Sequence, residues 1–399
     1  MKSEWKIEPL QNLISYIGKG IAPAYVEFED ENTVRVLNQK CNRNFRIDYK
    51  ESRLHDLNKR SVPQDKFLRD GDILINSTGT GTVGRIAQLN TVLCPTIVDG
   101  HMIVIRGNDK VTPLYLGYAL KAQQAKILQL DEGSTGQTEL NRTRLLSEIE
   151  IAYPTSLDEQ EFIVSTLASL DAKIDTNTAI NQRLEQIAKA IFKSWFVDFE
   201  PSKPITDFVE VLGGGTPKTG IPEYWNGVIP FFTPKDVSGV YTLTTEKTLT
   251  AEGLRNCNSR LFPTNTVFVT ARGTVGKLTL AGCPMAMNQS CYALIGKEGY
   301  GQYYVYHLTQ YVVENLKHKA SGAVFDAIVT RDFETELVPN ISPDEVRLFE
   351  DKVAPLYEAI LNYSQENARL ATIRDTLLPR LMSGELSVAE LGAFRILRG

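Results

Sequence analysis

Two stretches of the chain have the heptad spacing of a long amphipathic helix. In the first, apolar or interface positions follow one another at alternating steps of four and three residues: Ile163, Leu167, Leu170, Ile174, Asn177, Asn181, Leu184, Ala188, Ile191 and Trp195. Adding 186 to each number gives a matching second series: Phe349, Val353, Leu356, Ile360, Tyr363, Asn367, Leu370, Arg374, Leu377 and Leu381. This spacing is typical of helices that pack side by side. The pattern therefore predicts two long helices, the first over residues 157–196.

The first predicted helix has roughly 40 residues and is therefore about 60 Å long, which exceeds the width of a small domain. Its expected partner is the second helix, packed antiparallel; the alternative is that each helix packs on its own domain. Asn181 and Asn367 stand at the same point of the two series, where a buried polar pair can fix the register. Pro355 lies inside the second pattern, where it can kink the helix, and Gly384 predicts an end near Leu386.

The rest of the chain has the mixed pattern of two α+β domains. Short apolar and β-branched runs predict strands at 72–76, 102–105, 266–270 and 292–295, and helical stretches follow at 113–130 and 301–318. We therefore expect an α+β fold with a curved sheet in each domain. The expected arrangement is two globular domains in tandem repeat, each followed by a long α-helix, with the two helices packed as an antiparallel coiled coil.

The globular parts repeat one another as the helices do. Residues 81–85 (GTVGR) recur as 273–277 (GTVGK), 17–20 (IGKG) recur as 212–215 (LGGG), and the acidic pair at 158–159 recurs at 344–345. Because the matches come in the same order, the chain is interpreted as two copies of one unit. The predicted domains are 1–155 and 201–340, and the predicted helical regions are 156–200 and, with a C-terminal tail, 341–399.

Charge is distributed unevenly along the chain. The 399 residues carry a net charge of −5, which speaks against a nucleic-acid partner. However, residues 35–69 hold ten basic and four acidic side chains, whereas residues 156–200 hold four basic and eight acidic ones. The basic segment is either a DNA footprint or a solvated surface. The acidic helical region is expected to repel DNA and to receive protein partners.

Several classes of protein are disfavoured by the sequence. No apolar run is long enough for a membrane span, and five cysteines without a CxxC pair indicate neither a disulfide framework nor a zinc site, so a cytoplasmic location is expected. Residues 79–85 and 271–277 both depart from the GxxxxGK[ST] pattern of a phosphate-binding loop. Four scattered histidines form no metal-binding motif, and no methyltransferase or nuclease motif is present. We therefore expect no catalytic site, no metal and no cofactor in this chain.

Residues 192–201 (FKSWFVDFEP) and 377–386 (LLPRLMSGEL) look like the ends of the central and distal helical regions of one protein family, the specificity (S) subunits of Type I restriction-modification enzymes. Residues 154–160 and 339–345 resemble the Pro-rich, acidic starts of these helices. Residues 71–74 with 81–85, and residues 271–277, resemble the turn of each recognition domain. The resemblance covers essentially the whole chain.

The resemblance implies a sequence-specific DNA-binding subunit without catalytic activity of its own. Each target-recognition domain would bind one half of a split double-stranded DNA target, and the helices would set the spacer between the halves. Two modification subunits would dock on the helices and carry the adenine methyltransferase with its S-adenosylmethionine. Restriction and translocase subunits would complete the enzyme. The alternative from the residues alone is a coiled-coil adaptor that bridges two protein-binding domains.

The candidate DNA contacts are basic side chains in segments that are also rich in amide groups or glycine, since Lys and Arg bind phosphates and base edges. In the first domain they are Lys40, Arg43, Arg46 and Arg85, and in the second they are Lys235, Arg272 and Lys277. The small polar turns at 134–137 and 321–322 are further candidates. For each of these positions the alternative is a solvated loop.

Overall fold

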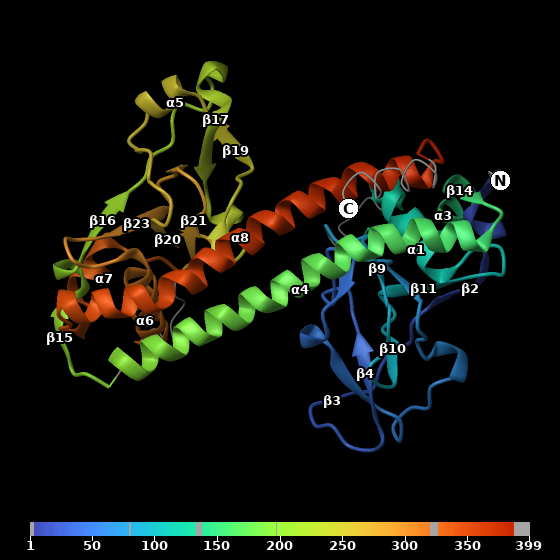
Figure 1. Ribbon diagram of the computed structural model, residues 1–399. Helices are drawn as coiled ribbons and strands as arrows, with labels where there is room; N and C mark the ends of the chain where they lie inside the picture. Colours follow the sequence, from blue (N-terminus) through green and yellow to red (C-terminus); the bar gives the residue numbers. More distant parts are fainter. Residues whose placement is uncertain (1–3, 80, 133–137, 197, 320–325, 387–399) are drawn as a thin grey trace. The chain divides into compact units, whose positions relative to one another are not determined.

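A computed structural model describes residues 4–79, 81–132, 138–196, 198–319 and 326–386, and the chain divides into two compact units. Unit 1 comprises Met1–Ala172 together with Ala371–Gly399, and unit 2 comprises Lys173–Leu370. The long helices α4 (Leu157–Phe196) and α8 (Pro343–Met382) each contribute residues to both units (Figure 1). Each unit therefore combines one mixed domain with parts of both long helices.

Two four-stranded sheets form most of the domain in unit 1. The first is antiparallel, with the order β2 (Ile14–Lys19), β11 (Met102–Gly107), β8 (Ile73–Asn76) and β9 (Ile86–Gln88). The second has the order β10 (Thr96–Val98), β4 (Thr33–Leu37), β7 (Arg53–Asp56) and β3 (Tyr25–Val26), with β10 and β4 parallel. Three further pairs are β1 (Trp5–Pro9) with β14 (Glu150–Pro154), β5 (Asn42–Arg43) with β6 (Arg46–Ile47), and β12 (Asp131–Glu132) with β13 (Glu139–Leu140). The expectation of one curved sheet is wrong, because the described strands of the two main sheets do not pair with each other.

Unit 2 repeats this arrangement. Its larger sheet has the order β16 (Val209–Gly213), β23 (Cys291–Gly296), β20 (Val267–Thr270), β21 (Leu278–Ala281) and β18 (Tyr241–Thr242). Its smaller sheet has the order β19 (Lys247–Leu249), β17 (Trp225–Phe232) and β22 (Ala286–Met287), and β15 (Pro201–Pro204) pairs with β24 (Leu337–Pro339). Strand β17 lies antiparallel to β19 and parallel to β22, as β4 does to β7 and β10. The sequence repeat is therefore a repeat of topology.

The shorter helices are α1 (Pro113–Ala122), α2 (Gln124–Ile127) and α3 (Arg142–Glu148) in unit 1, and α5 (Ala251–Arg255), α6 (Gln302–Lys319) and α7 (Thr330–Thr335) in unit 2. The helical stretch predicted at 113–130 contains α1 and α2, which are separated at Gln123. The side chain of Gln124 accepts a hydrogen bond from the amide of Ile86 (3.1 Å) and donates one to the carbonyl of Gly84 (2.6 Å). None of the described helices combines the length and the apolar composition that a membrane-spanning segment requires.

The long helices pack both on each other and on the domains, so the two alternatives from the sequence each hold in part. Every heptad position predicted from the sequence is buried or half-buried. In unit 1, Leu167 of α4 and Leu381 of α8 belong to the same apolar core as Tyr115 of α1. In unit 2, Phe192 of α4 and Phe349 of α8 join the core of the second domain. Each domain core is therefore completed by both helices.

The contacts within unit 2 show that the helices are antiparallel. Asn177 Nδ2 donates to Asn367 Oδ1 (2.9 Å), and Asn181 Nδ2 donates to Ser364 Oγ (3.1 Å), so residue numbers rise on α4 as they fall on α8. Asn181 and Asn367 occupy equivalent positions of the two copies and do not bond to each other. The predicted pair is thus replaced by a polar layer in which each asparagine contacts other residues of the opposite helix, as Asn367 does with Thr178 (3.2 Å).

Helix α8 begins with a cap and continues through Pro355. Ser342 Oγ donates to Glu345 Oε2 (2.6 Å), and the amide of Glu345 donates back to Ser342 Oγ (3.4 Å). The helix is continuous across Pro355 and ends at Met382. Gly384 follows with a φ of 73°, in the conformation that commonly ends helices.

Candidate nucleic-acid interface

A glycine loop follows β8 in unit 1 and closes through its own backbone. Gly81 and Gly84 have φ angles of 72° and 78°, in the left-handed region that favours glycine. The amide of Gly84 donates to the carbonyl of Asn76 (2.9 Å), and the amide of Asn76 donates to the carbonyl of Arg85 (2.9 Å). The loop thus extends the antiparallel pair of β8 and β9, with Arg85 at its end.

Unit 2 contains the same loop after β20. Gly273 and Gly276 have φ angles of 82° and 74°. The amide of Gly276 donates to the carbonyl of Thr270 (2.8 Å), and the amide of Thr270 donates to the carbonyl of Lys277 (2.9 Å). A Cβ on Gly273 would meet no atom within 4 Å, so backbone conformation rather than space requires glycine there. The sequence likeness of the two loops is therefore a likeness of conformation.

A two-residue hairpin, formed by β5 and β6, lies beside the glycine loop of unit 1. Asn42 is fully buried at its base, where Nδ2 donates to the carbonyl of Arg85 (2.8 Å) and lies 3.1 Å from Oδ1 of Asn76. Nδ2 of Asn76 donates in turn to the carbonyl of Gln39 (3.2 Å). The two asparagines hold the hairpin against the loop. Sequence reasoning missed both, because a buried asparagine leaves no signal in the apolar pattern.

The four cations predicted for the first domain gather on these two neighbouring segments. Lys40, Arg43 and Arg46 belong to the hairpin segment, Arg85 ends the loop, and all four are exposed. Arg43 Nε donates to the carbonyl of Lys40 (3.2 Å), and Arg85 Nη2 donates to the carbonyl of Gly81 (2.9 Å). Among the described residues, Lys40, Arg43 and Arg85 form no ion pair with an acid. Their charges therefore face solvent, as binding of an anionic ligand requires.

Other cations of the basic segment 35–69 interact with the protein itself. Arg35 Nη2 lies 2.6 Å from Glu29 Oε2, and the guanidinium of Arg53 lies 3.4 Å from the ring centroid of Tyr25. Fewer cations of this segment are therefore available to a ligand than its ten basic residues suggest. The candidate cations lie on the hairpin and the glycine loop.

The three cations predicted for the second domain also lie on adjoining segments. Lys235 lies on the 3-10 helix η6 (Pro234–Asp236), Arg272 and Lys277 flank the glycine loop, and all three are exposed. Thr274 Oγ1, within the loop, donates to the carbonyl of Pro234 (3.5 Å). None of the three cations forms an ion pair with an acid in the described part of unit 2. Each unit thus brings its predicted residues together.

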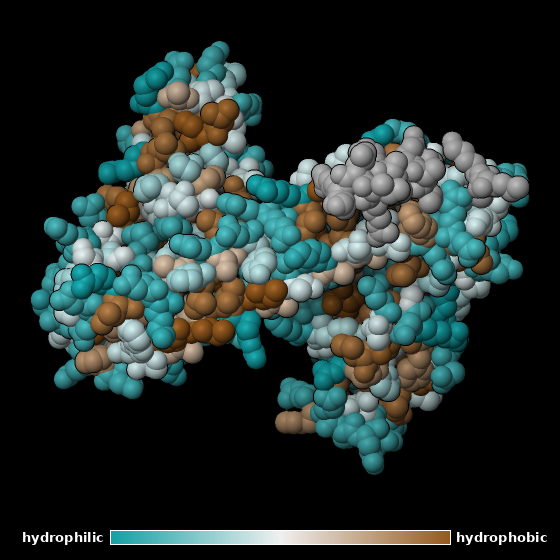
Figure 2. Space-filling view, in the orientation of Figure 1, coloured by the Kyte–Doolittle hydropathy of each residue, from teal (hydrophilic) through white to brown (hydrophobic). Residues whose placement is uncertain are grey.

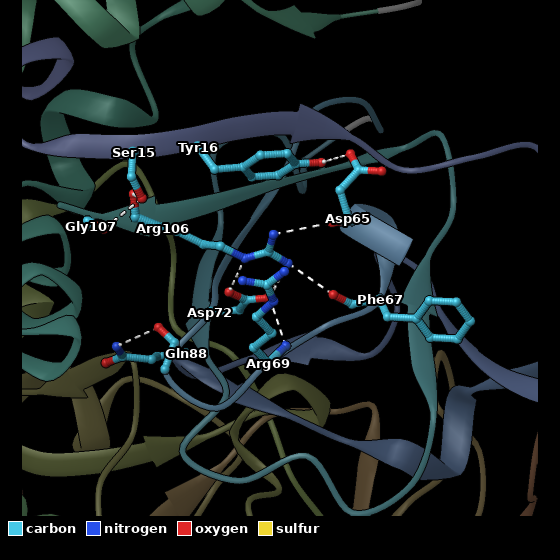
Figure 3. A network of polar contacts seen from close by, with 10 residues as sticks. Ser15, Tyr16, Asp65, Phe67, Arg69, Asp72, Gln88, Arg106 and Gly107 are labelled. Atoms are coloured by element: carbon cyan, nitrogen blue, oxygen red, sulfur yellow. Dashed lines mark hydrogen bonds and ion pairs between the residues drawn. The ribbon is translucent and has the colours of Figure 1, made fainter. Parts of the chain in front are cut away.

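A buried ion pair fixes the segment that leads into β8. Arg106 on β11 donates from Nε to Asp72 Oδ1 at 2.7 Å and from Nη2 to Asp72 Oδ2 at 3.0 Å (Figure 3). It also donates to the carbonyls of Asp65 (3.1 Å) and Phe67 (2.9 Å), and its guanidinium lies 4.5 Å from the ring centroid of Tyr16. The hydrogen bond to Asp72 raises the pKa of Arg106. The ion pair with Arg106 therefore holds Asp72, the residue immediately before the strand that leads to the glycine loop, in place.

The polar turns at 134–137 and 321–322, also predicted to contact DNA, lie outside the described residues. In the described ranges, no group of three or more His, Cys, Asp or Glu side chains could hold a metal ion. The candidate site in each unit consists of cations and polar backbone groups on a loop. Such groups can donate hydrogen bonds to phosphate oxygens and to base edges.

Comparison with known protein families agrees with the duplicated architecture. A sequence model for the Type I restriction modification DNA specificity domain matches residues 2–186 and, a second time, residues 197–339. The chain belongs to this family. Each matched range contains one glycine loop with its cations, so all seven predicted residues lie inside the specificity domains.

Individual Type I specificity subunits are similar to this chain, some over nearly its whole length and others over less than half of it. The HindI specificity subunit of Haemophilus influenzae is 24% identical, over 96% of this chain and 100% of its own. The MjaIX specificity subunit of Methanocaldococcus jannaschii is 32% identical, over 45% of this chain and 42% of its own. A crystal structure of the Type I restriction-modification S subunit from M. genitalium has a TM-score of 0.58 and 16% identity, over 95% of this chain and 96% of that one. That likeness shows a shared fold.

Proposed function

We propose that this specificity-family member recognises a split DNA target, with unit 1 binding one half and unit 2 the other. Specificity subunits of Type I systems are non-catalytic, and the enzymatic activities reside on their partner subunits. The observation that carries the proposal is the duplicated glycine loop, present once in each unit beside exposed cations. Six of these cations form no ion pair among the described residues: Lys40, Arg43, Arg85, Lys235, Arg272 and Lys277. A protein that contacts two half-sites needs two such surfaces, and this chain has two.

Within each surface, different cations are assigned to different tasks. The hairpin cations Arg43 and Arg46 are assigned to base edges, because the guanidinium can form two hydrogen bonds with guanine in the major groove. Arg85 and its counterpart Lys277 are assigned to phosphates, because each follows a loop whose backbone amides lie nearby. Lys40, Lys235 and Arg272 add positive charge to these surfaces and are proposed as further DNA contacts.

The recognition domains correspond, in this proposal, to residues 1–155 and 201–340, and the helical regions to 156–200 and 341–399. The helices set the spacer and receive two modification subunits, which carry the methyltransferase and its S-adenosylmethionine; restriction and translocase subunits complete the assembly. Support comes from large apolar side chains exposed on the helices: Leu157, Ile187, Leu348 and Ile373. Figure 2 shows hydrophobic areas, in brown, among hydrophilic side chains on the face in view. The acidic excess of residues 156–200 favours protein over DNA on this surface.

The first test is long-read sequencing of genomic DNA from a host that expresses this chain with its cognate modification subunit. A split motif with N6-methyladenine in both halves is the expected result. If the two proteins form a complex and no split motif is methylated, the proposed function is wrong, and the adaptor hypothesis takes its place.

The second test measures the affinity of the full-length chain for random duplex DNA over a range of salt concentrations. Each lost phosphate contact reduces the slope of log affinity against log salt by about 0.9. Lys277→Ala and Arg85→Ala are each expected to reduce the slope by about that amount. Lys59→Ala is the matched control: Lys59 belongs to the same basic segment, but its ammonium lies 3.8 Å from Asp56. Equal slopes for all variants and the wild type would exclude the glycine loops as phosphate contacts.

A further inference from the structure

The tip of the hairpin in unit 1 has a strained backbone. Arg43 pairs with Arg46, so Asn44 and Phe45 form a two-residue turn with φ angles of 53° and 61°. Two left-handed residues define the turn type that usually contains Asn-Gly. Phenylalanine in the place of glycine is strained in this conformation and persists only where the surroundings hold it. Backbone strain of this kind often marks a functional position.

The ring of Phe45 is held by a cation from the neighbouring helix α1. The ammonium of Lys121 lies 4.8 Å from the ring centroid of Phe45 and 5.4 Å from that of Tyr118. The side chain of Lys121 is only 10% exposed, and burial lowers its pKa. Desolvation strengthens the attraction between the ammonium and the face of the ring. A desolvated ammonium also needs an anionic partner.

The anionic partner belongs to the long helix α4. Asp171 Oδ2 lies 3.6 Å from the ammonium of Lys121, and the same carboxylate accepts hydrogen bonds from Tyr118 Oη (2.7 Å) and Arg374 Nη1 of α8 (2.7 Å). Burial alone would raise the pKa of Asp171, but these hydrogen bonds and the charge of Lys121 lower it. A continuous set of contacts therefore runs within unit 1 from the hairpin tip, through α1, to both long helices.

The corresponding place in unit 2 is built differently. Tyr357 occupies the α8 position that corresponds to Asp171, and its Oη lies 2.7 Å from His307 Nε2 of α6. Burial lowers the pKa of His307 to about 4, so this contact is uncharged at neutral pH. Where unit 1 has the hairpin, unit 2 has the one-turn helix η6. The charged contacts between Lys121 and Asp171 therefore occur in the unit that has the strained hairpin.

We propose that Phe45, Lys121 and Asp171 are positioning residues, which fix the tip of the hairpin to the long helices and so orient Arg43 and Arg46 toward the bases of one half-site. This inference rests on the proposed function. It implies that sequence recognition by unit 1 depends on a buried contact that touches no DNA. Loss of that contact relaxes the choice of bases in one half-site and leaves the attraction to phosphates unchanged.

The test compares methylation motifs of full-length variants expressed with the cognate modification subunit. Arg43→Ala identifies the half-site that unit 1 recognises. Lys121→Met, which keeps the stem but removes the charge, and Phe45→Gly, which suits the turn but removes the ring, are both expected to relax that same half-site. Discrimination at one or more of its bases should fall about tenfold, while the other half-site stays unchanged.

Two controls separate positioning from folding and from direct contact. Lys121→Arg keeps the cation and should retain the wild-type motif, as should Lys126→Met, which removes an exposed charge from the neighbouring helix α2. The salt slope of Lys121→Met on random DNA should equal that of the wild type, because Lys121 is assigned no phosphate.

The outcomes for this inference and for the proposed function are distinct. Absence of a split motif from the wild type contradicts the proposed function itself. A wild-type split motif that Lys121→Met and Phe45→Gly leave unchanged overturns the positioning role alone. So does equal relaxation of both half-sites, or a lower salt slope for Lys121→Met, since the first indicates general unfolding and the second a direct phosphate contact.

Discussion

Replacement of Glu350 by glutamine is expected to make the stability of unit 2 less dependent on pH. Glu350 lies on α8 beside the start of α6, where its Oε1 accepts a hydrogen bond from the amide of Tyr304 (2.6 Å). Gly301 leaves room for the carboxylate, because a Cβ there would come within 2.1 Å of Glu350 Cδ. Burial raises the pKa of Glu350 from 4.5 to about 7, although the backbone hydrogen bonds favour the charged form.

The direction in which the free energy of unfolding changes with pH depends on which state, folded or unfolded, binds the proton more tightly. Because the carboxyl pKa is raised, folded unit 2 binds the proton of Glu350 more strongly than the unfolded chain does. The free energy of unfolding therefore falls as pH rises from about 4.5 to about 7, and this contribution is constant at higher pH. One pKa unit corresponds to about 1.4 kcal/mol, so the loss approaches about 3 kcal/mol. Glutamine keeps an acceptor for the Tyr304 amide without a charge, and so lacks this loss.

Tryptophan fluorescence can follow unit 2 separately. Of the three tryptophans, Trp5 belongs to unit 1, whereas Trp195 and Trp225 belong to unit 2. In a Trp5→Phe background, the free energy of unfolding of unit 2 is measured with urea near pH 5 and near pH 8. Between these two pH values, unit 2 with Glu350 should lose about 2.5 kcal/mol more than the Glu350→Gln variant. Glu358→Gln, at an exposed position of the same helix, should behave as the wild type. The same pH dependence with Glu350 and with glutamine would refute the burial argument.

Two further substitutions test the supports of the candidate site. Asp72→Asn leaves the guanidinium of Arg106 without its buried partner and should lower the free energy of unfolding of unit 1 by about 3–5 kcal/mol. Adding Arg106→Met should restore part of that loss, as measured by urea unfolding followed at Trp5. Strictly additive effects of the two substitutions would contradict the pairing. Gly276→Ala should lower the thermal stability of unit 2 by about 1–2 kcal/mol, because its φ is 74° and a Cβ would lie 2.8 Å from Lys317 Cε. An unchanged melting temperature would show that the loop can rearrange.

The helices and the duplication could be predicted from the sequence because both depend on local periodicity. A heptad series is a property of consecutive residues, and the bounds 157–196 agree with those of α4. The direction of packing followed from the repeat, and the descending partners of Asn177 and Asn181 confirm it within unit 2. Exposed cations on glycine-rich or amide-rich segments could likewise be named, because loops of this composition lie at the surface.

What holds those cations in place could not be predicted, because it depends on contacts between distant residues. Asn42 bonds to Asn76 across 34 residues, and Asp171 bonds to Arg374 across 203. Phe45 is a residue for which sequence rules predict a strand or an apolar core, yet it occupies a left-handed turn. Of the predicted heptad positions, the charged cluster around Lys121 includes only Arg374. The apolar periodicity of the sequence therefore gave no sign of the cluster.

The division of the chain between the two units has a consequence for the order of folding during synthesis. The core of unit 1 contains Leu10 and Tyr115, but also Leu378, Leu381 and Met382, which the ribosome adds only after the whole of unit 2. The domain that emerges first is thus completed last, while unit 2 is contiguous and can close earlier. A chain that stops before α8 is finished leaves the apolar surface of unit 1 uncovered. Exposed apolar surface of this kind favours aggregation, so we expect unit 1 to reach its full stability only once α8 has been synthesised.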